Sequence, residues 1–434
     1  MASSVTEQRA TSDLNIFAFW KAQMPAWKVT VIRTSLERLG YKLVLPYLTL
    51  YIVMMGATTT QIGFVTSAGL ICAAILGPIL GQYIDIHGPK QMYIMGIFIL
   101  MGGYLAFWGA PIWQVAALGM FLHQMGSTLG GQSCSNICGN CLANCDRAKG
   151  MLVCETLAAG VLGMIGPAFA GWFLVNIMKV TGQPTSPEQI RPLFLFTLML
   201  TIISLFVVWF KLDVRFLGTG VPREKRNAFK DAIAMMKADK NCMKWVMMVG
   251  VGRMPVAMIV PFLQLYAVSV KGATAAQVAA LTTATALTSV ACGYMFGMLS
   301  DKFGRKITLT STIILYIGGL LLLILSPGNT VTFIVVGMLA GFQEIGQVLA
   351  GSIQHELVPG WARGRWAGVN SMAGSIVSAA GAALAGIVYD NWSPSMLFVV
   401  YIAAELIIRL PLLFSLPETL RYKVNEEHFA ALKD

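Results

Sequence analysis

Stretches of 20 or more mostly apolar residues recur along the whole chain, and this feature limits the possible fold more than any other. A helix that crosses a bilayer needs ~20 such residues. Backbone groups in hydrocarbon need internal partners, and these runs are too long for barrel strands, so the chain is predicted to be an all-α membrane protein. Twelve transmembrane helices are predicted, at residues 29–55, 61–84, 91–110, 113–142, 150–176, 191–211, 242–270, 275–300, 306–326, 329–357, 364–389 and 393–416.

Composition and charge support this class. Of the 434 residues, 56% are hydrophobic and 12% charged, against about a quarter charged in soluble domains. The net charge of +11 would suggest nucleic acid in a soluble protein. Here nine Lys and Arg lie between Lys211 and Lys244 in a segment predicted to be inside, whereas outside loops carry Lys179, Arg191 and Lys271. The positive-inside rule therefore predicts a multi-pass protein of the cell membrane (inner or plasma), with both termini cytoplasmic. The first 20 residues lack a basic start followed by an apolar core, so no cleavable signal peptide is expected.

The two halves of the chain repeat each other. "GQYIDIHGPK" from Gly81 returns as "GMLSDKFGRK" from Gly297, an offset of 297 − 81 = 216. "RLGYKLVLPYLTLY" from Arg38 returns as "RMPVAMIVPFLQLY" from Arg253, an offset of 253 − 38 = 215. Such halves are related by an axis along the membrane normal, with a site between them. The predicted segments are an N-terminal stretch 1–28, a six-helix bundle 29–211, a basic linker 212–241, a second six-helix bundle 242–416 and a tail 417–434.

The repeated loop resembles a signature of the major facilitator superfamily. Its two copies consist of Gly81, Asp85, Gly88 and Lys90, and of Gly297, Asp301, Gly304, Arg305 and Lys306. The glycines permit a tight turn, and the aspartates can cap a helix and pair with a cation. In that family the cluster is a conformational latch that stabilises one of two access states. The first copy has Pro89 where an arginine is usual, so we expect its latch to be the weaker.

The first predicted helix carries charges deep in the membrane. Glu37 and Arg38 lie ~12–14 Å from its start, near the middle of a ~30 Å hydrocarbon core. Charges there cost at least ~2.5–3.5 kcal/mol each, so they are expected to face a wet cavity or a partner. In the superfamily, the first, fourth, seventh and tenth helices line the central cavity. The resemblance therefore implies that Arg38 and its repeat mate Arg253 clamp a carboxylate or phosphate from opposite halves.

Glu37 and Glu344 are the candidates for proton coupling. Glu37 follows Arg33 by four residues, which places both on one helical face. One interpretation is a structural ion pair; the other is that protonation of Glu37 releases a nearby arginine to bind substrate. Glu405 and Arg409 have the same spacing in the last predicted helix, where a structural pair is expected.

The fourth predicted helix carries a stripe of amides that includes Gln132 and Asn136. Amides are costly in lipid, so this stripe is expected to line the cavity. Further candidate substrate contacts are Gln347, Tyr51 and Tyr266.

A second stripe on this helix consists of Cys134, Cys138, Cys141 and Cys145. Four thiols resemble a soft-metal site, but this stripe extends ~16 Å along a helix, too far for one tetrahedral ion. Packing against a neighbouring helix is the favoured interpretation. No metal or other cofactor is predicted.

The fifth predicted helix, "GVLGMIGPAFAGW", resembles the antiporter signature of drug:proton exporters. It keeps Gly166, Pro167 and Gly171, whereas Ala170 replaces a glycine. Glycines let helices pack closely, and Pro167 frees a carbonyl, which predicts a flexing point. This resemblance favours export.

Together these features predict a secondary active transporter, not an enzyme, that moves a small organic anion by proton-coupled alternating access. The sequence has no G-x-x-x-x-G-K-[ST] loop for nucleotide hydrolysis. One alternative is a proton-driven exporter of drugs or lipids, and another is a non-transporting membrane receptor on the same fold. The expected partners are a small-molecule substrate, protons and the lipid bilayer, without nucleic acid, and the protein is expected to be a monomer.

Overall fold

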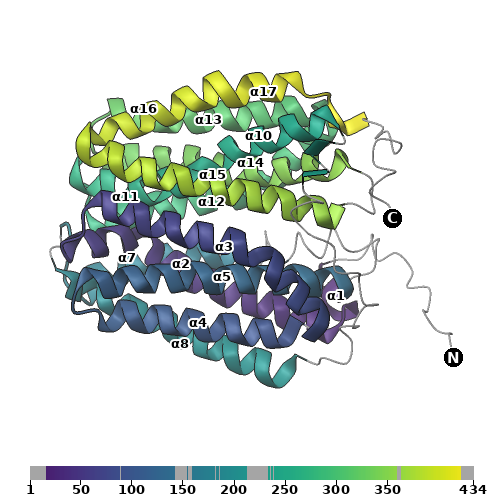
Figure 1. The fold of residues 1–434 in the computed structure, drawn as a ribbon. Helices are drawn as coiled ribbons and strands as arrows, with labels where there is room; N and C mark the ends of the chain where they lie inside the picture. Colours follow the sequence, from purple (N-terminus) through teal and green to yellow (C-terminus); the bar gives the residue numbers. More distant parts are fainter. Residues whose placement is uncertain are drawn as a thin grey trace.

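The structure is a computed structural model. It describes residues 16–87, 89–141, 154, 159–180, 182–184, 186–212, 233–234, 236–237, 239–358 and 363–421. Helices and the turns between them account for this described part of the chain, which contains no β-strand. Figure 1 shows the N-terminal helices, purple to teal, gathered in one half of the molecule and the C-terminal helices, green to yellow, in the other.

Each half contributes six long helical segments, preceded in the N-terminal half by a short helix, α1 (Ile16–Ala22). The N-terminal segments are α2 (Pro25–Met54), α3 (Thr59–His87), α4 (Pro89–Gly109), α5 (Trp113–Cys141), α7 (Ala159–Asn176) and α8 (Pro187–Lys211). The C-terminal segments are α10 (Lys240–Met254) continued by η3 (Pro255–Ile259) and α11 (Val260–Ser269), then α12 (Ala275–Phe303), α13 (Arg305–Leu325), α14 (Thr330–Glu356) and α15 (Arg363–Asn391), and finally α16 (Pro394–Ala404) continued by η5 (Glu405–Arg409) and α17 (Leu410–Ser415). A 3-10 turn, η6 (Thr419–Arg421), follows.

The helix boundaries reproduce the sequence repeat. Helix α2 and the segment from α10 to α11 begin and end 215 residues apart (240 − 25 and 269 − 54). Helices α4 and α13 begin and end 216 residues apart (305 − 89 and 325 − 109). The duplication predicted from short motifs therefore extends to whole helices.

The predicted spans agree closely with these helices, and the predicted fold class is confirmed. Nine helices of the described part are long and apolar enough to cross a membrane. Three of the twelve segments are not among them: α2, which carries five charged residues, α5, and α7, which is described over only 18 residues. Most of the predicted linker, residues 213–232, lies outside the described part, as does most of the predicted tail, 422–434.

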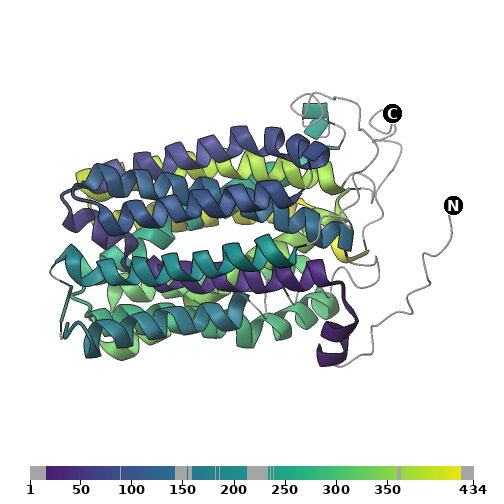
Figure 2. The ribbon, with the colours of Figure 1, turned by 90° about the horizontal axis from the view of Figure 1, so that it is seen from below.

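Helix α1 and the C-terminal end of α17 lie at the same end of the molecule, which we call the terminal end; the opposite end is the distal end (Figure 1). Seen from below in Figure 2, the long helices run along a common axis, and α1 lies at the terminal end of α2. Large apolar side chains such as Phe210, Ile307 and Ile407 are exposed on the outside. This is the surface that a bilayer would cover.

Candidate functional site

An ion pair joins the two bundles at their centre. Lys42 Nζ on α2 lies 2.5 Å from Glu344 Oε1 on α14. Glu344 follows the first residue of α14, Thr330, by 14 residues, which places it ~21 Å from the distal end of that helix. Its side chain is nevertheless 41% exposed, against 17% for Lys42. This carboxylate is thus partly exposed at mid-helix, at the boundary between the bundles, while it is bonded to the opposite bundle.

Two more polar groups act on Glu344. Arg38 interacts with its carboxylate electrostatically, and the Ser289 side chain of α12, whose hydroxyl donates to the Ala286 carbonyl at 3.0 Å, lies close to it. Arg38 lies four residues before Lys42, on the same face of α2, and its side chain is exposed. The structure therefore brings Arg38 together with Glu344, two residues that the sequence analysis selected separately, and adds Lys42, which it did not select.

Arg253 lies elsewhere in this conformation. It is half-buried on α10, two residues before Pro255 opens the π-helix η3. Its side chain packs against Gly374 of α15, where a Cβ would collide with it. The Ser378 hydroxyl of α15 donates to the Arg253 carbonyl at 3.2 Å. The contacts described for Arg253 thus tie it to α15, and its role as half of an anion clamp stays a prediction.

Glu37 forms an ion pair with Arg33 inside the N-terminal bundle, as the structural interpretation predicted. The Arg33 guanidinium is buried, packs against Gly130 of α5 and lies over the Tyr93 ring, 4.5 Å from its centroid. Proton coupling through Glu37 stays a prediction.

A histidine that the sequence analysis overlooked packs against aromatic rings inside the N-terminal bundle. His123 of α5 stacks on Tyr41 of α2, with ring centroids 4.7 Å apart, and meets the edge of Tyr104 of α4. A lone histidine in an apolar helix shows no partner spacing in sequence, so no signal marked it.

The predicted amides lie within their own bundles. Gln347 Nε2 donates to the Gly252 carbonyl of α10 at 2.7 Å, which ties α14 to α10. Gln132 Oε1 is buried and has no hydrogen-bond partner in the described part of the chain. Asn136 lies on α5, but its side chain is outside the described part.

The two tyrosines are buried away from the central pair. Tyr51 Oη donates to the Phe107 carbonyl at 2.6 Å. Tyr266 Oη and Ser395 Oγ are 2.9 Å apart. In this conformation neither tyrosine is brought together with Lys42 and Glu344.

Beyond the central pair, hydrogen bonds between the halves gather at the distal end. Asp390, near the end of α15, accepts bonds from Thr59 and from the Thr60 hydroxyl and amide, the last two at 2.6 and 2.7 Å. Its carboxylate therefore caps the N-terminus of α3 across the bundle boundary, a favourable position for a negative charge. Tyr47 Oη also donates to the Ala275 carbonyl at 2.8 Å. These contacts close the distal end.

The second copy of the predicted latch forms a network at the terminal end. Arg305 Nη2 lies 3.0 Å from Glu356 Oε1, and the Arg305 amide donates to Glu418 at 2.8 Å. Lys306 Nζ donates to the Leu416 carbonyl at 2.6 Å. Gly304 adopts φ 109° between α12 and α13, where a Cβ would also press on Glu418. Glu356 and Glu418 complete a network that the sequence motif only partly revealed.

The first copy is described only in part. Lys90 Nζ donates to the Leu212 carbonyl at the end of α8, at 2.8 Å, which matches the bond of Lys306. Gly88 lies outside the described residues. Gly81 is described only as part of α3, and the side chains of Asp85 and, in the second copy, Asp301 lie outside the described part. Gly297 lies on α12, where a Cβ would meet open space. Latch function stays a prediction for both copies.

Helix α7 uses its glycines for close packing. A Cβ on Gly166 would lie 2.8 Å from the Leu39 carbonyl oxygen of α2, and one on Gly171 would collide with Ala279 of α12. Helix α7 continues through Pro167 to Asn176. Flexing at Gly166 and Pro167 stays a prediction.

Of the cysteine stripe, Cys134 is described. It is buried, and its sulfur lies 3.6 Å from Thr34 Oγ1 of α2, so this thiol points towards a neighbouring helix. The side chains of Cys138, Cys141 and Cys145 are outside the described part. The described residues include no group of three or more His, Cys, Asp or Glu able to hold a metal ion.

The predicted pair in the last helix is confirmed. Arg409 Nη1 lies 3.0 Å from Glu405 Oε1, and Tyr401 Oη donates to the same oxygen at 2.5 Å. The Glu405 side chain is 0% exposed, and Arg409 packs against Gly252. This ion pair lies inside the C-terminal bundle and is structural.

Family comparison assigns the chain to a class. The family model described as the Major Facilitator Superfamily matches residues 31–272 and 246–432. The chain therefore belongs to the major facilitator superfamily, as the loop motif suggested. It is a multi-pass integral membrane transporter.

Individual relatives are distant. The uncharacterized MFS-type transporter YqjV of Bacillus subtilis (strain 168) is 34% identical over 70 residues, which are 16% of this chain and 17% of that protein. A D-xylose-proton symporter has a TM-score of 0.70 at 14% identity, covering 92% of this chain and 100% of its own. The peptide transporter POT in complex with sulfate also has a TM-score of 0.70 at 14% identity, covering 95% and 98%. At 14% identity, the likeness to these two structures shows a shared fold and no more.

Proposed function

We propose that the protein is a proton-coupled symporter of small organic anions that works by alternating access. The observation that carries this proposal is the ion pair between Lys42 and Glu344 at the meeting of the two halves. The Glu344 carboxylate can take up a proton, and in the absence of substrate it forms an ion pair with the Lys42 ammonium.

In this proposal, electrostatic interactions at the central site couple binding of the proton to binding of the anion. An unpaired charge in mid-membrane costs at least ~2.5–3.5 kcal/mol. The empty transporter moves with Lys42 and Glu344 paired, and the loaded one moves with Glu344 protonated and the anion bound to Lys42. Lys42, Glu344 and their ligands sum to zero charge in both states, and Arg38 adds the same single positive charge to each. Binding only the proton or only the anion leaves one ion unpaired, so the two cross together.

The charges around the pair favour an anion. Arg38 and Lys42 lie on one face of α2, opposite Glu344. Arg253 is the proposed second contact, reaching the anion when α10 moves relative to α15. Arg supplies a planar fork for carboxylates or phosphates. One structural neighbour is named for proton symport and another is a peptide transporter in complex with sulfate, both compatible with this proposal.

In this proposal, access to the central pair of Lys42 and Glu344 is controlled by contacts at the ends of the two bundles. The contacts of Asp390 hold the distal end closed, so the conformation is closed to the side where distal helix ends lie. Opening that end requires Asp390 to release α3. We further propose that the terminal end faces the cytoplasm, following the distribution of Lys and Arg, and that the protein works as a monomer.

Transport by purified protein in liposomes tests the proposal. A panel of labelled monocarboxylates is first ranked by thermal shift, because a binder raises apparent stability. Uptake of the best binder is then driven by an imposed pH gradient, acidic on the side of addition, at zero membrane potential. Accumulation above equilibrium is expected, and a membrane potential alone should not drive it, because the proton and a monovalent anion cancel in charge.

Other outcomes identify the alternatives. Export of an amphiphilic cation driven by protons, without carboxylate uptake, would replace the proposal with a drug exporter. Ligand binding without any flux would indicate a receptor.

A further inference from the structure

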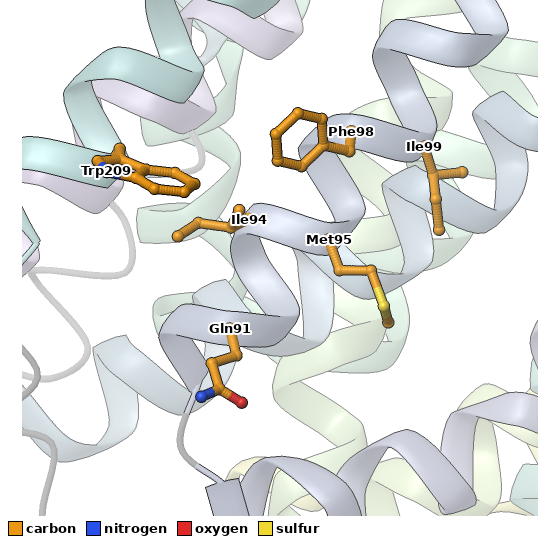
Figure 3. Close-up of a pocket in the computed structure, with 6 residues that line it drawn as sticks. All are labelled: Gln91, Ile94, Met95, Phe98, Ile99 and Trp209. Atoms are coloured by element: carbon orange, nitrogen blue, oxygen red, sulfur yellow. The ribbon is translucent and has the colours of Figure 1, made fainter.

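A groove of about 520 Å³ lies on the outside of the N-terminal bundle, between α4 and α8. It is lined by Gln91, Ile94, Met95, Phe98, Ile99 and Trp209. In Figure 3, Trp209 of α8 extends towards Ile94 and Phe98 of α4, and Gln91 lies nearest the start of α4. This volume falls within the ~300–1,000 Å³ range of small-molecule sites. Neither helix carries Lys42 or Glu344, so the groove is separate from the central site.

The groove is polar at one end and apolar along its length. Gln91 is its one polar lining residue and the third residue of α4, which places it at the terminal end. From there the groove continues along α4 to Ile99, ~12 Å deeper into the membrane region. The exposed indole of Trp209 lies two residues before the end of α8, the level at which tryptophans meet lipid headgroups.

A lysine stands at the polar end. Lys90 Nζ donates to the Leu212 carbonyl at 2.8 Å, so its ammonium lies where the ends of α4 and α8 meet. A carbonyl satisfies one of the three ammonium donors but does not cancel the positive charge. The groove thus has an amide at the level of headgroups and an apolar channel leading inward, and the Lys90 ammonium lies outside its lining, next to Gln91 at the polar end.

We propose that this groove binds an anionic phospholipid from the leaflet at the terminal end. One acyl chain lies along Ile94, Phe98 and Trp209, and the phosphate contacts Lys90 and Gln91. Basic pockets between transmembrane helices on the cytoplasmic side bind anionic headgroups, and this leaflet is the anionic one. The terminal end is the side predicted to be cytoplasmic. The proposal does not depend on which solute is transported.

The matching surface of the other half keeps the lysine, as Lys306, but lacks the amide and part of the apolar channel. The offset of 216 places Ile307 at the position of Gln91, Thr310 at that of Ile94, and Ile314 at that of Phe98. The polar end is thereby replaced by an apolar residue and part of the channel by a hydroxyl. This surface serves as a control within the same chain.

Native mass spectrometry of the full-length protein, with added phosphatidylglycerol or phosphatidylcholine of identical chains, tests the proposal. We expect one phosphatidylglycerol to be retained at collision energies that strip phosphatidylcholine. Ile94→Trp fills the channel and Gln91→Glu repels the phosphate, so each should reduce this retention at least ~5-fold. Ile314→Trp and Ile307→Glu, on the control surface, should leave it unchanged.

Two results would overturn the proposal. Equal retention of both lipids by the unaltered protein would mean a generic lipid-facing surface. Undiminished retention in Ile94→Trp would place the lipid elsewhere, and circular dichroism of each variant confirms that it is folded.

Discussion

Lys42 Nζ on α2 and Glu344 Oε1 on α14 lie 2.5 Å apart, and this bond joins two halves that repeat each other in sequence. The pair itself does not obey the repeat. At the offset of 215, the repeat position equivalent to Lys42 is Ala257, and the position equivalent to Glu344 is Leu129. Each half therefore supplies one charge that the other half lacks. A symmetric scaffold that carries an asymmetric ion pair at its centre is suited to bind two unlike ligands, a proton and an anion.

Neutralising one member of this pair should be worse than neutralising both. Lys42→Met leaves Glu344 without its ion-pair partner and Glu344→Gln does the same to Lys42, whereas the double variant has no ion of the pair left. We expect the double variant to unfold at a higher temperature than Lys42→Met, with a coupling of at least ~0.5 kcal/mol in the double-mutant cycle. Purely additive effects would mean that the pair contributes nothing to holding the bundles together.

Asp390 should hold the distal end closed. Asp390→Asn removes the charge that caps α3, and Gly386→Val places a side chain where a Cβ would lie 2.7 Å from Thr60 Cα. Both should increase the distance between spin labels at residues 58 and 392, measured by double electron–electron resonance in a background without native cysteines. Glu188→Gln alters an exposed carboxylate at the same end and should leave the distances unchanged. If Asp390→Asn keeps the original distance distribution, the capping contact is not what closes this end.

The buried pair in the last helical segment should govern the stability of the C-terminal bundle. Removing one partner of a buried ion pair typically costs ~3–5 kcal/mol, because the other charge is left in a dry site. We expect a loss of about this size in Glu405→Gln and Arg409→Met, measured by detergent-induced unfolding. Glu188→Gln again serves as the control, with a change within ~0.5 kcal/mol. Comparable losses in all three variants would show that the ion pair of Glu405 and Arg409 contributes no more to stability than an exposed carboxylate does.

The loop motif yields a separate prediction. If it works as a latch between access states, Asp301→Asn should change the populations seen with the same pair of spin labels, even though Asp301 lies at the terminal end. A distance distribution like that of the unaltered protein would instead make the motif architectural. That result would agree with the described contacts of Arg305, which remain within the C-terminal half.

The fold was predictable because its signals are local and repeated. Apolar runs of helical length predicted the helices, and motifs repeated at offsets of 215 and 216 residues predicted the two halves and the family. The short helix α1 (Ile16–Ala22) was missed, since seven residues without an apolar run of membrane length carry no such signal. The pair formed by Glu405 and Arg409 was predictable because its members are four residues apart on one helix.

The central site was only partly predictable because its partners lie far apart in the chain. Lys42 and Glu344 are separated by 302 residues. Glu344 was selected for its depth, but nothing in the sequence linked it to Lys42. Asp390 and Glu418 were missed for the same reason, because each caps the start of a helix distant in sequence. Arg253 shows the converse limit, since a repeat fixes its position on the helix but not the direction of its side chain.

The measurement that tests the central claim most directly is transport by Glu344→Gln. Glutamine keeps the shape of the side chain but cannot bind or release the proton. In liposomes, this variant should still exchange labelled for unlabelled anion across the membrane, while accumulation driven by a pH gradient falls to equilibrium. Glu188→Gln, which alters an exposed carboxylate at the distal end, is the matched control and should retain that accumulation. Full pH-driven accumulation by Glu344→Gln would contradict the account, because the proton would then be carried by another group.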